Sequence, residues 1–191
     1  MEQIVVYKRD GTKRCDLNSY AKLCTVKSAE QKCELLGEDT VTIKTESVEP
    51  LDFSIGDYII VYSKVYTLNK LGEPKKSEER KFEYTLVFEG LQYKLLDAQF
   101  RSADASGYNP TSEFPLVADI KTVMQILVRC VNRTAASIGE VWVLGDCIET
   151  EYKELSFNNE NCLSVLQRVC SEFETEFEIE PLVNRVYKLH I

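Results

Sequence analysis

Histidines, closely spaced cysteines and clustered glycines are scarce in this 191-residue sequence, and each scarcity argues against one class of site. His190 is the only histidine, and no two cysteines form a C-x-x-C pair, so a zinc site has little support. The eight glycines stand singly, which argues against a glycine-rich phosphate-binding loop. A Ser-His-Asp triad would depend on His190, one residue from the end of the sequence. We therefore expect neither an enzyme nor a protein that holds a cofactor or a metal.

Long apolar runs and an excess of basic residues are also lacking. No stretch of about 18 apolar residues is present, so no membrane-spanning helix is expected. The first residues, MEQIVVYKRDGTKR, do not follow the plan of a secretory signal, and we expect synthesis and folding in the cytoplasm. The formal net charge is −8, from 31 acidic and 23 basic residues. Stable binding of duplex nucleic acid is not expected, because phosphate neutralisation needs a basic surface.

Seven cysteines are present, and this odd number cannot all be used in a disulfide framework. We interpret them as free thiols that are mostly buried and fill the core as small apolar side chains. They are Cys15, Cys24, Cys33, Cys130, Cys147, Cys162 and Cys170.

The strongest structural signal lies in residues 160–179. Apolar residues recur there at steps of three and four, which is typical of one helical face, and Asn158 and Asn159 precede them as candidate caps. After Phe173 apolar and acidic residues alternate as far as Glu180, which predicts a strand. The predicted helical face consists of Cys162, Leu163, Leu166, Val169, Cys170 and Phe173.

The first hundred residues contain short alternating stretches separated by turn signals such as Asp10-Gly11 and Gly56-Asp57. Several short strands at such intervals favour an antiparallel sandwich or barrel over a parallel sheet. The predicted strands are 4–7, 20–26, 31–36, 40–45, 51–55, 58–62, 66–71, 82–88 and 93–96.

The character of the sequence changes after Phe100. Residues 101–114 have a loop composition and form the predicted boundary between domains. A helix is predicted at 116–132, with Pro115 at its start, where proline is well tolerated. The remaining predicted elements are strands at 141–144 and 152–157 and a hairpin of 176–180 and 185–191. This mixture predicts an α+β fold.

One basic cluster could act as a docking site. It is interrupted by Glu73, Glu78 and Glu79, so it is either a solvated hairpin tip or a loop that docks on an acidic neighbour. Its members are Lys70, Lys75, Lys76, Arg80 and Lys81.

An acidic run also invites a functional interpretation. Glu172 and Glu174 are followed by Glu176, Glu178 and Glu180, and the last three share one face of the predicted strand. No convergent group from elsewhere is visible, so we interpret the run as a solvated acidic face rather than as a metal or acid–base cluster.

The order of these segments resembles the N-terminal hub module of the phage tail-associated, or baseplate hub, protein family, which is related to contractile-phage hubs and type VI secretion spike proteins. The resemblance covers nearly the whole chain. Four stretches carry it: Phe53–Ile60 (FSIGDYII), Tyr66–Leu68 continuing through Phe82–Gly90, Asp119–Asn132 followed by Gly139–Gly145, and Asn161–Cys170 continuing through Ile179.

This resemblance implies a β-barrel-like tube domain in residues 1–100, a small α+β insertion in 101–150, and a return to a tube-type domain in 151–191. It further implies a ring of three copies at the end of the tail tube, with other tail or baseplate proteins as partners. The protein is then expected in the bacterial cytoplasm during assembly and afterwards in the virion tail. The alternatives are a monomeric ligand-binding β-barrel, a type VI secretion spike-like component and, on scattered acids and serines alone, a small hydrolase.

Overall fold

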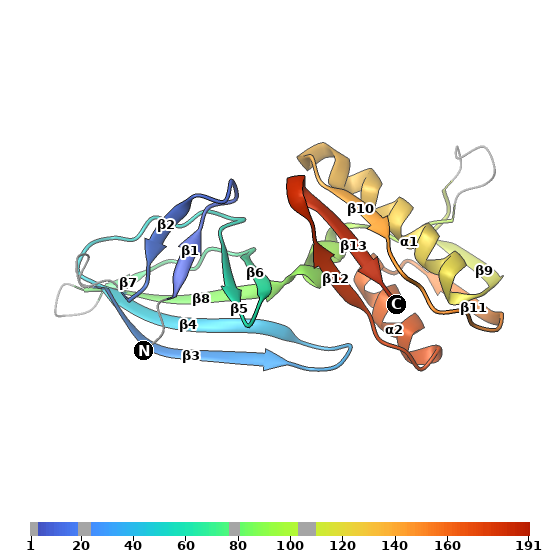
Figure 1. The fold of residues 1–191 in the computed structure, drawn as a ribbon, viewed down its shortest axis with the longest axis horizontal. Coiled ribbons are helices and arrows are strands. Elements are labelled where there is room, and N and C mark those ends of the chain that lie inside the picture. Colours follow the sequence, from blue (N-terminus) through green and yellow to red (C-terminus); the bar gives the residue numbers. More distant parts are fainter. Residues whose placement is uncertain (1–3, 19–23, 77–80, 103–109) are drawn as a thin grey trace. The chain divides into compact units, whose positions relative to one another are not determined.

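The structure is a computed structural model that describes residues 4–18, 24–76, 81–102 and 110–191. It divides into two compact units, Met1–Leu91 (unit 1) and Gln92–Ile191 (unit 2). Unit 1 is built from antiparallel strands and unit 2 combines two α-helices with two small sheets (Figure 1). The predicted α+β class with a barrel-like antiparallel sheet is therefore confirmed.

The described residues of unit 1 form one curled, eight-stranded sheet in the order β2-β1-β5-β6-β8-β4-β3, with the short β7 also paired to β8 (Figure 1). All of its pairings are antiparallel. The strands are β1 (Val5–Tyr7), β2 (Lys13–Asp16), β3 (Cys24–Cys33), β4 (Asp39–Ser47), β5 (Tyr58–Val61), β6 (Lys64–Leu68), β7 (Lys75–Lys76) and β8 (Phe82–Gly90).

The core of unit 1 follows from alternation along these strands. In β8 the side chains of Tyr84, Leu86 and Phe88 are buried, whereas Thr85 and Val87 between them are exposed. Such a pattern places one face of the sheet against the core. The core cluster contains Val6, Cys15, Leu17, Val41, Ile43, Ile59, Tyr66, Leu68, Tyr84, Leu86 and Phe88.

A charged turn precedes β5. Residues 51–55, predicted as a strand, are irregular instead. The reason is that Asp57, which is 1% exposed, accepts a hydrogen bond from the Ser54 backbone N–H at 2.8 Å and folds this segment into a turn. Arg14 from β2 also binds the segment, through the Asp52 carbonyl and the Ser54 hydroxyl, both at 3.0 Å.

Unit 2 combines its two α-helices with two small sheets. The order β10-β13-β12 forms one sheet, in which β10 and β13 are parallel, and β9 and β11 form the other. The helix α1 packs on β10 and on α2. The elements are a 3-10 helix (Leu91–Asp97), β9 (Glu113–Ala118), α1 (Ile120–Ala135), β10 (Val141–Leu144), β11 (Lys153–Asn158), α2 (Cys162–Glu172), β12 (Glu178–Pro181) and β13 (Val186–His190).

Three local predictions in unit 2 were wrong. Tyr93 lies in the 3-10 helix rather than in a strand. Pro115 lies in β9, and α1 begins only at Ile120, because Asp119 caps it by accepting the Thr122 N–H at 2.9 Å. The cap of α2 is Asn161, whose side chain accepts the Ser164 N–H, rather than Asn158 or Asn159.

The β3 prediction needs one further correction. The sequence predicted two strands, 20–26 and 31–36, but the structure has one continuous strand over Cys24–Cys33. β3 pairs with the uninterrupted β4 along its whole length, so its polar middle also stays in the strand. One bulge near Lys27 interrupts the pairing. Residues 20–23 lie outside the described residues.

Candidate assembly interface

The most open element of unit 1 is strand β3. Among the described strands it pairs only with β4, so one side of its backbone points away from the sheet (Figure 1). Cys24 is its one buried residue, and residues 27–33 are exposed on both faces. It contains neither proline nor glycine. A long edge strand with free backbone groups is a template for pairing with another strand.

The exposed half of β3 is nevertheless held in place by its neighbours. Gln31 donates to the Tyr66 hydroxyl at 2.7 Å, and that hydroxyl donates to Asp39 at 2.8 Å. Burial and the Asp39 carboxylate together raise the pKa of the Tyr66 phenol above its usual value. A Cβ atom at Gly90 would lie 2.8 Å from the Asp39 carboxylate, so any larger residue there would push against Asp39. The exposed edge strand is therefore tied to β6 and β4 by side-chain hydrogen bonds.

The lysines of β3 do not protect its edge. Lys27 pairs with Glu46 at 2.9 Å, and Lys32 pairs with Glu38 at 3.3 Å. Both partners belong to β4 or to the turn before it, so the two charges are directed back along the hairpin. Edge strands that avoid pairing commonly present lysines, a proline or a β-bulge. In β3 the two lysines are tied to the hairpin, and the bulge lies near Lys27, so the stretch after it carries no such device.

In unit 2 the edge strand β10 is closed by a side chain. Asn132 of α1 donates through its Nδ2 to the Trp142 carbonyl and accepts the Trp142 N–H through its Oδ1, both at 2.8 Å. The amide thus takes the place that a neighbouring strand would occupy. At the other edge of this sheet, β12 ends in Pro181, which has no N–H to donate. By contrast, β3 contains no proline, and it is one of the two end strands of the described unit 1 sheet, with β2 as the other.

The two hairpin tips beside this edge carry exposed apolar residues. Leu35, in the β3–β4 turn, is 71% exposed, and Tyr62, in the β5–β6 turn, is 84% exposed. Leu36, Tyr62 and Ser63 have φ values of 51°, 47° and 66°, a region that tight hairpins usually fill with asparagine or glycine. Lys64 Nζ lies 3.8 Å from Cys33 Sγ, so the two hairpins are neighbours. Residues that violate local preference while exposed often serve a partner.

The structure partly describes the basic cluster predicted from the sequence. Lys75 and Lys76 form β7 beside the start of β8, and Lys70 lies earlier in the same loop; all three are exposed. Lys81 is half-buried and pairs with Glu46 at 3.3 Å. Arg80 lies outside the described residues. Whether these residues dock on a neighbour remains a prediction.

The glutamates of the acidic run do not converge on one point. Glu172 lies in α2 and pairs with Arg168 at 2.8 Å, whereas Glu178 is exposed on β12. Glu180 lies 3.3 Å from Lys188 and 3.4 Å from His190, and the hydrogen bond from His190, with that from Lys188, lowers the pKa of Glu180. Within the described ranges, no three His, Cys, Asp or Glu side chains are placed to hold a metal ion.

The cysteines behave as the sequence predicted. All seven are free thiols, and five of them are buried; Cys33 is exposed and Cys147 is half-buried. The thiol of Cys162 and the Arg101 N–H lie against the Cys130 sulfur, and these contacts lower the pKa of Cys130. Cys33 is thus the exposed thiol of the open edge strand.

No helix in the described part of the chain is long and apolar enough to cross a membrane.

Sequence reasoning did not identify the open edge. Order along the chain does not say which strand ends a sheet, and this was settled by the pairing of β4 with β8 on its other side. One usable signal was present: the stretch KSAEQK in β3 has no apolar alternation. A strand that is polar on both faces is one that no other layer covers.

Comparisons with known proteins agree with this architecture. No protein-family model matches the sequence, and no curated protein matches it significantly. Among solved structures, the prophage tail protein gp18 from Listeria monocytogenes EGD-e is similar over 99% of this chain, with a TM-score of 0.57 and 11% sequence identity. This chain covers 50% of the gp18 chain. The two proteins therefore share a fold over one half of gp18.

Proposed function

We propose that this chain is a non-enzymatic structural component of a phage or prophage tail, a baseplate-hub or tail-tip module that assembles into a ring at the end of the tail tube. The observation that carries the proposal is the similarity in fold to a prophage tail protein over 99% of the chain. The resemblance in segment order to the hub family supports the finer assignment.

The open strand β3 supports self-assembly as the mode of action. The sheet of unit 1 ends in β2 on one side and in β3 on the other. Pairing of β3 with the opposite edge of the next copy is a heterologous contact, and such contacts close into a ring when the rotation between copies divides a full turn. Backbone hydrogen bonds then satisfy the free groups of the edge.

In this proposal three copies form the ring. Residues 1–100 and 151–191 contribute tube-type segments and residues 101–150 the insertion. Other tail or baseplate proteins bind the ring, and the cluster of Lys70, Lys75, Lys76, Arg80 and Lys81 is a docking loop. Assembly takes place in the bacterial cytoplasm, and the product belongs to the virion tail.

A lysine added to the edge tests the role of β3. Ala29 is exposed and lies opposite Ile43 of β4. We expect Ala29→Lys to weaken self-association about tenfold or more, because a lysine on an edge strand opposes strand pairing, and tenfold corresponds to about 1.4 kcal/mol. Light-scattering mass over a concentration series measures this against the monomer mass of 21.9 kDa. The thiol of Cys33 gives a second readout, since assembly should slow its modification by a maleimide.

The matched control is Thr85→Lys. It places the same charge on an exposed position of the same sheet, but in β8, which is paired on both sides. This variant should associate like the unmodified protein. A wild-type chain that stays monomeric up to its solubility limit would refute the ring. Equal masses for Ala29→Lys and wild type would remove β3 from it.

A further inference from the structure

Strands β10, β13 and β12 of unit 2 present a face that combines apolar and acidic side chains. The register puts Val141 beside Val186, and Val143 beside Lys188. Glu180 lies opposite Lys188 on the other side of β13. We call this surface the valine–glutamate face; it consists of Val141, Val143, Glu178, Glu180, Val186, Lys188 and His190, with Glu176 just before β12.

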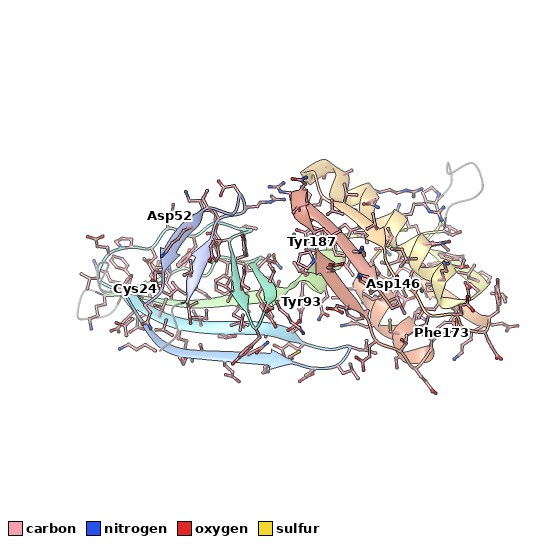
Figure 2. All side chains as sticks on the ribbon, in the orientation of Figure 1. Cys24, Asp52, Tyr93, Asp146, Phe173 and Tyr187 are labelled. Carbon is pink, nitrogen blue, oxygen red and sulfur yellow. The ribbon has the colours of Figure 1, made fainter. Side chains whose placement is uncertain are left out.

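The core of unit 2 lies on the opposite side of the same sheet. Trp142 is 1% exposed and Leu189 is fully buried, and Trp142 stacks on Tyr187, with 5.0 Å between ring centroids. The side chains of this unit, including Tyr187, are drawn in Figure 2. In contrast, Val141 is 48% exposed and Val143 is 37% exposed. Neighbouring exposed valines on one sheet face indicate an interaction surface more strongly than scattered single residues do.

The apolar part of the face extends to the end of the β12–β13 hairpin. Val183 in the hairpin turn is 80% exposed, and Ile138 before β10 is 47% exposed. Arg185 donates to the Ile138 carbonyl at 2.9 Å, which brings the two segments together. Because Asn132 closes the β10 edge, a partner would contact the side chains of this face rather than add a strand to the sheet.

The charges on the face select the chemistry of that partner. Glu176 and Glu178 are exposed, and Asp146, labelled in Figure 2, is fully exposed beside the end of β13. Lys188 is already paired with Glu180. The face is therefore negative as well as apolar. A complementary partner carries exposed basic residues around an apolar side chain, since complementary potentials guide association and fix its orientation.

Unit 1 contains a segment with these properties. Leu71 is 49% exposed, and the same loop carries the exposed Lys70, Lys75 and Lys76 against one exposed acid, Glu73, so its charge is positive. We call residues 70–76 the basic loop. It contains three of the four described members of the docking cluster that the sequence predicted, and the fourth, Lys81, is paired with Glu46.

We propose that the basic loop of one copy docks on the valine–glutamate face of a second copy, with Leu71 against the valines and the lysines beside Glu176 and Glu178. This inference rests on the proposed function, which requires copies of the chain to associate. A contact between unit 1 of one copy and unit 2 of the next is heterologous, as ring closure requires. This side-chain contact acts in addition to strand pairing through β3, and it fixes the orientation in which one copy binds the next.

Charge reversal tests the contact directly. Lys70→Glu with Lys76→Glu, and separately Glu176→Lys with Glu178→Lys, should each weaken association about tenfold or more. Combining all four substitutions in one chain should restore the association, because the charges of loop and face are then exchanged. Sedimentation velocity at low salt measures the masses, and Trp142 fluorescence checks that unit 2 is folded. Glu180 is left unchanged because it is paired with Lys188.

The control and a second variant keep the result interpretable. Glu149→Lys with Glu151→Lys makes the same charge change at exposed positions outside the face and should leave association unchanged. Leu71→Ser removes the apolar contact from an exposed loop and should weaken association. If the chain associates and Ala29→Lys disrupts it, but neither the charge reversals nor Leu71→Ser has an effect, this inference is overturned and the proposed function stands. A wild-type chain that never associates overturns both.

Discussion

Asp57→Ala is expected to lower the free energy of unfolding of unit 1 by about 3 kcal/mol, since breaking one side of a buried ion pair costs about 3–5 kcal/mol. The Asp57 side chain is 1% exposed and that of Arg14 is 15% exposed, with 2.5 Å between Arg14 Nε and the Asp57 carboxylate. Within the described residues no group accepts a hydrogen bond from the Arg14 Nε, so this contact is a charge pair. Removing the carboxylate leaves the guanidinium with only the exposed Asp52 as a charge partner and leaves the Ser54 N–H without its acceptor.

Urea unfolding followed by circular dichroism measures this loss. The single tryptophan, Trp142, lies in unit 2 and reports on that unit separately. Asp52→Ala is the matched control, because its carboxylate lies 3.5 Å from the same arginine but is 94% exposed. Exposed pairs contribute about 0–1 kcal/mol, so this variant should unfold nearly like wild type. Equal losses for the two variants would show that burial of Asp57 is not what stabilises the turn.

Asn132→Ala should lower the stability of unit 2 by about 2–3 kcal/mol. It leaves the N–H and the carbonyl of Trp142 without partners, and each unsatisfied buried group costs about 1–3 kcal/mol. The higher helix propensity of alanine in α1 offsets about 0.6 kcal/mol of that loss. The variant also opens the β10 edge, so we expect it to aggregate more readily than wild type.

Trp142 fluorescence during urea unfolding follows this variant, and light scattering follows its aggregation. Gln125→Ala is the control, since Gln125 is an exposed residue of the same helix and its replacement should change stability by less than about 0.5 kcal/mol. An Asn132→Ala variant as stable and as soluble as wild type would mean that the β10 edge is not protected by this amide. The contrast between a β10 edge closed by a side chain and a β3 edge without such a cap would then no longer hold.

The elements that the sequence predicted well depend on local pattern. The alternation in Thr40–Thr45 and Phe82–Phe88 predicted the centres of β4 and β8, and the three- and four-residue spacing after Glu160 predicted α2. The C-terminal hairpin was also predicted, because Ile179 and Leu189 pair across it as the alternation requires. Residues a few positions apart carry enough information for such elements, since burial on one face imposes the period.

Pro115 shows where the local pattern gave the wrong answer. A proline before an apolar run favours a helix start, but here it lies in β9, with Phe114 packed against Phe100 and Phe157 at centroid distances of 5.8 and 5.1 Å. The aromatic packing joins three segments that are distant in sequence. Tertiary burial of this kind outweighs a weak local preference.

The sequence by itself determined that this protein has short antiparallel strands, two amphipathic helices, free thiols and an acidic surface. Only the tertiary structure decided that β3 is an open edge, that Asn132 closes β10, and that Asp57 meets Arg14. The physical reason is distance along the chain. Period and composition act over a few residues, whereas an edge, a side-chain cap or a buried ion pair exists only once residues 10 to 43 positions apart have been brought together.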